Sequence, residues 1–253
     1  MPRRLHAYEL QRRNHRTCQS VRSFTAHGAR RWAAAISLAV LFVSLARTPL
    51  YAQDPPPRIG PWVVDLHGVM PRFGDDPALA QSRDLSQAEL PGVGLGVTAG
   101  VHLYLPKILG LTVGLGGEGL IGRSHSEPPG PTVDPRTGVS IPSTLRPVTE
   151  TFKSISPQVS LNFGNGNGWS YLSVGIGGSI WSLIPEGLEP LPADEERIRT
   201  INYGGGARWF IKPRLGFSLD VRLYEIDNGT PQLGYPGSPR TVLLVIGAGI
   251  SIK

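Results

Sequence analysis

The stretch that decides the fold is LGFSLDVRLY, residues 215–224. Apolar side chains occupy every second position from Leu215 to Leu223, and glycine or polar residues fill the positions between them. Successive side chains of an extended strand point to opposite faces. The stretch is therefore predicted to be a β-strand with one apolar face and one polar face, and the polar face carries Asp220 and Arg222.

The same alternation recurs in a series of runs along the chain. No helical periodicity of comparable length competes with them. The 32 glycines and 24 prolines also disfavour a helical domain, since both residue types weaken helices. The region 61–253 is therefore predicted to be all-β. The eight runs lie at 61–70, 92–105, 109–122, 152–163, 169–181, 198–211, 214–226 and 240–252.

The connections between these runs alternate between long and short. Because strands joined by hairpins run antiparallel, all the long loops then lie at one end of the sheet. Outer-membrane barrels have this asymmetry, together with an even number of strands of about 10 residues each. Their sheet must close, because lipid offers no partner to an unpaired backbone group. The sequence therefore predicts an eight-stranded antiparallel up-and-down transmembrane β-barrel. The long connections are 71–91, 123–151, 182–197 and 227–239.

The apolar face of the predicted strands indicates which side meets lipid. This face contains no charged residue in 215–223 or in 242–252, which a surface in water rarely allows. It is therefore predicted to face outward to the membrane. A soluble lipocalin-like barrel, which would bury this face around a ligand, is a weaker interpretation.

The polar face is predicted to line the lumen and to form an interior polar network that plugs the barrel. Charged side chains in a narrow lumen must be paired, because an unpaired buried charge is costly. A contact among Arg208, Asp220 and Glu118 would favour a plugged barrel, whereas a continuous file of water would favour a narrow pore or a channel for small molecules. The predicted members of the network are Asp65, His67, His102, Glu118, Asn202, Arg208, Asp220 and Arg222.

Aromatic residues lie near the ends of the predicted strands. Amphipathic rings favour the level of the lipid headgroups, so the sequence predicts two interfacial girdles. The predicted girdle residues are Trp62, Tyr104, Phe152, Phe163, Trp169, Trp181, Trp209 and Tyr224.

The segment 1–52 differs from the rest of the chain. Its nine arginines and one acid give it a charge of +8, so the remaining residues carry −2 of the total of +6. A basic region followed by the uncharged run 32–46 is typical of a secretory signal peptide. Cleavage is expected near Ala52, before a short Pro-rich segment at 53–60. Because the basicity belongs to this leader, nucleic-acid binding by the barrel is not expected.

Two neighbouring strands carry a resemblance to a known family. YGGGARWF (203–210), a turn and GFSLDVRLY (216–224) resemble small bacterial outer-membrane β-barrels of the OmpA-like and OmpX-like kind. The resemblance covers about 59–253 and implies a location in the outer membrane of a Gram-negative cell. It also implies contact with membrane lipid and lipopolysaccharide, and insertion by the barrel-insertion machinery. The sequence ends in Lys253, where such barrels usually end in an aromatic residue.

The sequence offers few candidates for chemistry. His125-Ser126-Glu127 in a long loop, a metal site between His67 and His102, and cation binding by the acidic run 194–196 all have simpler explanations as loop or lumen residues. The single cysteine lies in the leader, which excludes thiolate chemistry in the barrel. We therefore expect no catalytic residues, no metal and no cofactor. The predicted role is structural, in membrane integrity, or an interaction at the cell surface.

Overall fold

A computed structural model describes residues 57–107, 110–127, 130–141, 143–232, 234 and 236–253. The predicted signal peptide at 1–52 lies outside the described residues. Of the segment at 53–60, only 57–60 are described.

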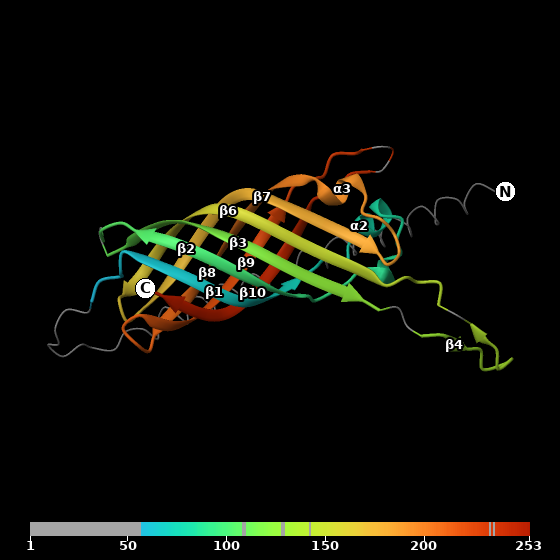
Figure 1. The fold of residues 1–253 in the computed structure, drawn as a ribbon, viewed down its shortest axis with the longest axis horizontal. Helices are drawn as coiled ribbons and strands as arrows, with labels where there is room; N and C mark the ends of the chain where they lie inside the picture. Colours follow the sequence, from blue (N-terminus) through green and yellow to red (C-terminus); the bar gives the residue numbers. More distant parts are fainter. Residues whose placement is uncertain (1–56, 108–109, 128–129, 142, 233, 235) are drawn as a thin grey trace, which may run out of the picture. The chain divides into compact units, whose positions relative to one another are not determined.

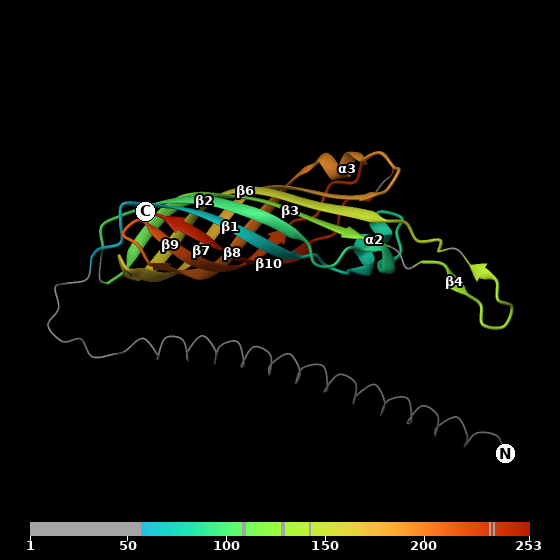
Figure 2. The same cartoon turned by 60° about the horizontal axis from the view of Figure 1, so that its bottom comes forward.

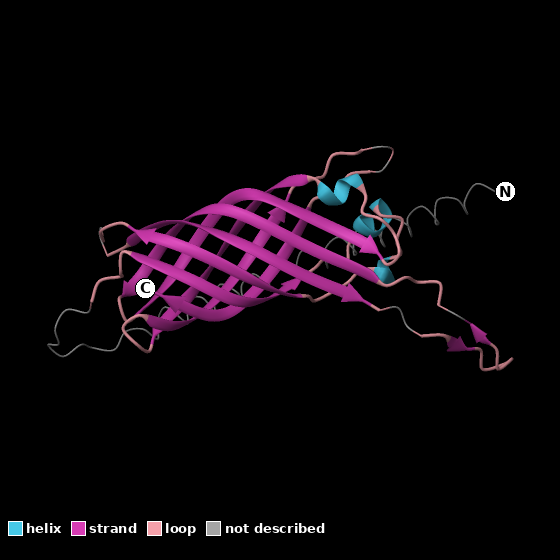
Figure 3. Ribbon diagram, in the orientation of Figure 1, coloured by secondary structure: helices cyan, strands magenta, loops and turns pink. Residues whose placement is uncertain are grey.

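Eight long strands close into a single antiparallel barrel, as predicted (Figures 1 and 3). Around the wall the order is β1-β10-β9-β8-β7-β6-β3-β2, so the first strand pairs with both the second and the last. Closure leaves no strand edge without a partner, which is the condition for a sheet in lipid. The strands are β1 (Trp62–Arg72), β2 (Leu95–Tyr104), β3 (Thr112–Ser126), β6 (Val148–Asn165), β7 (Gly168–Pro185), β8 (Arg197–Phe210), β9 (Leu215–Ile226) and β10 (Thr241–Ile252).

The long connections lie at one end of the barrel and the short turns at the other (Figures 1 and 2). In outer-membrane barrels the long loops are extracellular and the short turns periplasmic. We name the long connections loop 1 (73–94), loop 2 (127–147), loop 3 (186–196) and loop 4 (227–240).

Three strands extend further toward the loop end than the hydrophobic alternation predicted. β3 continues to Ser126, β6 begins at Val148, and β7 continues to Pro185. Ladder pairs such as Ser124 with Glu150 continue through this region. Backbone pairing does not require an apolar face, so a strand that rises beyond the lipid carries polar residues there and its periodicity fades.

The long loops contain short elements that the sequence analysis did not predict. Each is too short to show a hydrophobic period. Loop 1 holds the helix α2 (Pro77–Ser82) and the 3-10 turn η1 (Gln87–Glu89). Loop 2 holds the hairpin β4 (Thr132–Val133) and β5 (Ser140–Ile141), and loop 3 holds α3 (Pro192–Glu195). No helix in the described ranges is long and apolar enough to span a membrane.

The outward face of the wall is an apolar belt. Along β1, buried and exposed residues alternate without interruption from Trp62 to Arg72. Leu219 on β9 is 42% exposed, while its neighbour Asp220 is 7% exposed. Lipid-facing aliphatic side chains and inward polar side chains are thus separated by strand parity, as the alternation predicted.

The prediction of two aromatic girdles is wrong for five of its eight members. Four of the eight side chains are at most 3% exposed and point into the lumen, because they occupy inward positions in the strand alternation: Phe152, Trp169, Trp181 and Tyr224. Tyr104 is half-buried and packs edge-on against Trp169, with ring centroids 5.8 Å apart. The exposed rings of Trp62, Phe163 and Trp209 all lie at the turn end, so they form one girdle rather than two.

The loop-side part of the lumen holds a buried apolar cluster, which the sequence analysis did not predict. Inward side chains such as Leu120, Phe152 and Leu243 form one buried cluster there. Loop 1 folds onto this cluster and contributes Leu79 and Leu85 to it. Asp76 is the N-cap of its helix α2, and the Asp76 carboxylate accepts a hydrogen bond from the Ala78 N–H at 2.8 Å. The loop therefore caps the lumen.

Candidate functional site

The turn-side part of the lumen holds a bidentate ion pair that crosses the barrel. Arg208 on β8 donates hydrogen bonds to both carboxylate oxygens of Asp65 on β1, with Nε–Oδ1 at 3.0 Å and Nη2–Oδ2 at 2.6 Å. Ser251 donates a further hydrogen bond to Asp65 at 2.5 Å. The Arg208 guanidinium also lies 3.9 Å from the ring centroid of Tyr171. Such paired, stacked geometry offsets the cost of burying the two charges.

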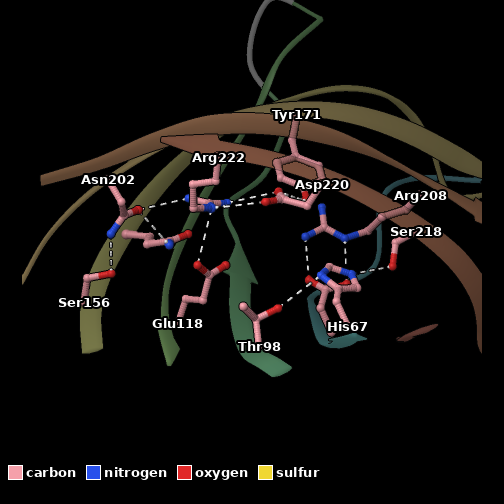
Figure 4. Close-up of polar contacts among 12 residues, drawn as sticks. His67, Thr98, Glu118, Ser156, Tyr171, Asn202, Arg208, Ser218, Asp220 and Arg222 are labelled. Carbon is pink, nitrogen blue, oxygen red and sulfur yellow. Dashed lines mark hydrogen bonds and ion pairs between the residues drawn. The ribbon is translucent and has the colours of Figure 1, made fainter. Parts of the chain in front are cut away.

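A second arginine makes the next set of contacts. Arg222 on β9 lies 3.2 Å from Asp220 and 3.3 Å from Glu118 on β3, so one guanidinium bridges two carboxylates (Figure 4). It also donates a hydrogen bond to the side-chain oxygen of Asn202 at 3.0 Å. The guanidinium therefore has partners on three strands.

Neutral groups join these two ion clusters into one network. The Tyr171 hydroxyl donates a hydrogen bond to Asp220 at 2.6 Å while its ring lies against Arg208. The Tyr224 hydroxyl donates to Glu118 at 2.7 Å. Asn202 donates to Ser156 at 2.6 Å, on the opposite side from Arg222 (Figure 4). These links make a continuous network across the lumen.

The two histidines of the predicted network lie at different levels. His67 is within 2.7 Å of the Ser218 hydroxyl and 3.4 Å of the Thr98 hydroxyl. The β1–β2 register pairs His67 with Thr98, whereas His102 is opposite Val63, four residues away along β1. The register therefore does not bring the two imidazole rings together at a shared metal site. Within the described ranges, no three His, Cys, Asp or Glu side chains are grouped to hold a metal ion.

The ion pairs differ from the contact among Arg208, Asp220 and Glu118 that the sequence analysis considered. Arg222, rather than Arg208, contacts both Asp220 and Glu118, and Arg208 pairs with Asp65. Parity along a strand identifies which residues face inward. It does not identify which of them meet, because that depends on the stagger of strands around the closed wall.

Inward glycines provide the space that the network occupies. A Cβ atom at Gly206 would lie 2.7 Å from the Tyr171 hydroxyl oxygen, and one at Gly204 would lie 2.8 Å from the Cα of Arg222. Any larger residue would displace these side chains or the neighbouring strand. The YGGGARWF motif therefore combines an arginine of the network with the empty positions that let the network form.

A second set of buried charges joins the extracellular loops. Arg83 of loop 1 lies 3.3 Å from Asp194 of loop 3, and both side chains are only 2% exposed. Arg83 also donates a hydrogen bond to Ser238 of loop 4 at 2.8 Å. Three loops are thus connected through one guanidinium. The sequence analysis missed this contact, because loop residues carry no periodic signal that indicates their partners.

Glu89 connects loop 1 to loop 2 in a similar way. Its carboxylate accepts hydrogen bonds from the backbone N–H groups of Ser86 at 2.7 Å and Arg146 at 2.8 Å. Burial alone would raise the pKa of Glu89. The hydrogen bonds to its carboxylate and the Arg146 charge outweigh burial, so its pKa lies below the ordinary value.

The other residues considered for chemistry do not form a site. His125 contacts the Thr149 hydroxyl at 3.2 Å, whereas Ser126 donates a hydrogen bond to the Glu89 backbone oxygen, so the two side chains have separate partners. In the acidic run 194–196, Asp194 forms an ion pair with Arg83. Glu196 accepts a hydrogen bond from the Thr230 N–H. These acids therefore attach loops to one another.

A closed eight-stranded sheet, an outward apolar belt and a polar lumen decide the class of protein. The chain has the fold of a small bacterial outer-membrane β-barrel. Its place is the outer membrane, because this is the membrane that such barrels span.

Comparisons with known proteins find similar structures at low sequence identity. The structure is similar to Neisserial surface protein A, with a TM-score of 0.48 and 10% identity over 77% of this chain and 97% of that one. It is similar to Ail, the attachment invasion locus protein of Yersinia pestis, with a TM-score of 0.45 and 12% identity over 76% and 97%. The outer-membrane protease OmpT from Escherichia coli matches with a TM-score of 0.40 and 8% identity over 81% and 99%. No protein-family model matches the chain, and no curated protein matches it in sequence.

Proposed function

We propose that this outer-membrane barrel is non-enzymatic and non-conducting, with a role in membrane integrity or in interactions at the cell surface. The observation that carries this proposal is the burial of Arg208 and Arg222, each 2% exposed at the centre of the network. In a water-filled pore these long side chains would be solvated. Here their guanidinium groups bind carboxylates across the lumen, which supports a plug.

The loop-1 cap adds a second barrier above the network. Leu79 and Leu85 lie in the same buried cluster as the lumen residue Leu120. The Arg83–Asp194 pair holds loop 1 to loop 3 above it. A solute entering from outside would have to displace this apolar cap before it reached the ion pairs.

The β4–β5 hairpin supports a role at the surface. Its turn is ordered by Asp134, which accepts hydrogen bonds from the Arg136 N–H at 2.8 Å and the Thr137 hydroxyl at 2.9 Å. The hairpin extends beyond the loop end of the barrel (Figures 1 and 2). Val133 and Ile141 are exposed on it. An ordered projection with exposed aliphatic side chains is suited to contact with another molecule.

We further propose outer-membrane lipid, with lipopolysaccharide in the outer leaflet, as the lipid partner, and the barrel-insertion machinery as the partner during assembly. The apolar belt supports contact with lipid. We propose that the interior network named in the sequence analysis has a structural role, and that the barrel has no catalytic, metal-binding or cofactor-binding residue.

Recording from planar bilayers tests the plug. We expect the folded barrel to give no stepwise ion currents. Asp65→Ser combined with Arg208→Ser, which removes a complete pair, is expected to give small, frequent currents. Arg214→Ser at a periplasmic turn is the matched control and stays silent. Stable stepwise currents from the unmodified barrel would overturn the plug in favour of a narrow pore.

Sensitivity of cells to detergent separates the two proposed roles. Cells without the barrel are expected to become detergent-sensitive, and a barrel lacking the hairpin 131–141 is expected to restore resistance if the role is structural. If the hairpin-deleted barrel fails to restore resistance although it is present and folded, the loops and their partners carry the function. Normal resistance without the barrel would exclude the structural role.

A further inference from the structure

A groove of about 390 Å³ runs across the outer wall of the barrel, on the side that faces lipid. It crosses β2, β3, β6, β7 and β8, and we name it the wall groove. No acidic side chain lines it. Its outward lining consists of Val97, Ala99, Gly119, Ile121, Lys153, Ile155, Gly178, Ile180 and Arg197.

Strand register explains why the wall is hollowed at this place. Two neighbouring rows of paired residues cross the five strands. The upper row is Val97, Ile121, Lys153, Ile180 and Arg197, and the lower row is Ala99, Gly119, Ile155, Gly178 and Arg199. Three of the five lower positions are Ala or Gly, so the floor there is largely backbone, while branched aliphatic side chains stand on either side.

The groove has room for an apolar chain. A Cβ atom at Gly119 would meet only the Ser154 backbone oxygen, at 3.9 Å, so nothing of the barrel fills the space above it. At Gly178 a Cβ atom would lie 3.0 Å from the aliphatic carbons of Arg197. The Arg197 stem therefore forms one wall of the groove.

Two cations flank this apolar floor. Lys153 and Arg197 are exposed, and each pairs through its backbone with Ile180, so they are separated by two strand spacings, about 10 Å. Arg123 and Arg199 are also exposed in the adjoining rows. None of these four side chains forms a salt bridge with another residue in the described ranges.

The position of the wall groove along the barrel axis indicates which leaflet of the membrane it faces. Arg197 is the first residue of β8, and Val97 is the third residue of β2 counted from loop 1. Both therefore lie in the part of the wall near the loop end. The cations are then at the height of the headgroups of the outer leaflet, and the groove opens to the acyl chains below them.

We propose that the wall groove binds an acylated glycolipid of the outer leaflet that carries phosphate. An acyl chain lies over Gly119 and Ala99, and a phosphate group lies between Lys153 and Arg197. An uncharged lipid would leave both cations without a partner. The inference specifies a site for the proposed lipid partner, so it rests on the membrane orientation of the proposed function but not on the plugged lumen.

Native mass spectrometry of the full barrel tests the site, with diphosphorylated lipid A and phosphatidylcholine as the probes. We expect the barrel to retain lipid A preferentially. Lys153→Gln with Arg197→Gln is expected to lower this preference about 25-fold, since each cation near an anionic headgroup contributes a factor of about five. Lys212→Gln with Arg214→Gln at a periplasmic turn is the charge-matched control and keeps the preference.

Filling the groove supplies an independent test. Gly119→Leu is expected to reduce retention of lipid A at least tenfold, whereas Gly117→Leu, on the same face of β3 but outside the groove, leaves it unchanged. Heat-modifiable gel mobility shows that each variant is folded. Equal retention of both probes by the unmodified barrel, or an unchanged preference in the double variant, would mean annular lipid only and overturn the site. The plug is judged by conductance, so the two proposals fail separately.

Discussion

Arg208 and Asp65 form a bidentate ion pair across the lumen, although β9 and β10 separate their strands in the wall. The pair therefore bonds opposite parts of the barrel through its interior, independently of the backbone ladder. Its two side chains are nearly inaccessible, so each charge depends on the other for its compensation.

Removing one member of this pair should destabilise the barrel strongly. We expect Arg208→Ala to lower the free energy of unfolding by about 3–5 kcal/mol, because it leaves Asp65 buried without its cation. Urea titration in lipid vesicles, followed by Trp fluorescence, measures the change. Arg214→Ala provides the control, with a change within about 0.5 kcal/mol. If Arg208→Ala changed stability no more than this control, the pair would contribute little.

Placing a charge on the outward face of β9 tests whether this face meets lipid and at what depth each residue lies. Leu219 is 42% exposed in the middle part of the apolar belt, and we expect Leu219→Arg to cost about 2–4 kcal/mol of folding in a bilayer. Leu215→Arg, on the same face at the start of β9, should cost about 0–1 kcal/mol, because it lies near the interface. Equal effects at both positions would contradict a membrane-depth dependence.

The Arg83–Asp194 pair should hold the loop-1 cap closed. We expect Arg83→Ala to increase hydrogen exchange of the amides in 77–90, because loop 1 then loses its contacts with Asp194 and Ser238. Exchange measured by mass spectrometry on the folded barrel reports this directly. Arg136→Ala in the exposed hairpin should leave exchange in loop 1 as it is. Unaltered exchange in Arg83→Ala would show that apolar contacts alone hold the cap.

Acid should release the contact between loops 1 and 2. The pKa of Glu89 is lower in the folded protein than its ordinary value of 4.5. Its contribution to stability is therefore present above pH 4.5 and is lost as the pH falls through the lower, folded value. We expect exchange of the η1 amides to rise below about pH 4.5, and Glu89→Gln to remove this dependence on pH. The same acid response in Glu89→Gln would assign it to another group.

Much of the barrel follows from local sequence alone. The alternation in 215–224 identifies a strand with a lipid face, and the alternating connection lengths place the loops at one end. Parity also places Asp65, Arg208 and Arg222 on the inward face. These features are predictable because the membrane imposes a period of two on every strand and forbids an unpaired edge.

Contacts between distant strands could be identified only from the tertiary structure. Which carboxylate each arginine meets depends on the stagger around the closed wall, and no strand encodes that stagger by itself. The apolar cluster in the loop-side part of the lumen and the Arg83–Asp194 pair also join segments that are far apart in sequence. The wall groove likewise exists only because register aligns Ala99, Gly119 and Gly178 on separate strands. Periodicity determines the direction in which a side chain points, whereas closure of the sheet determines what that side chain meets.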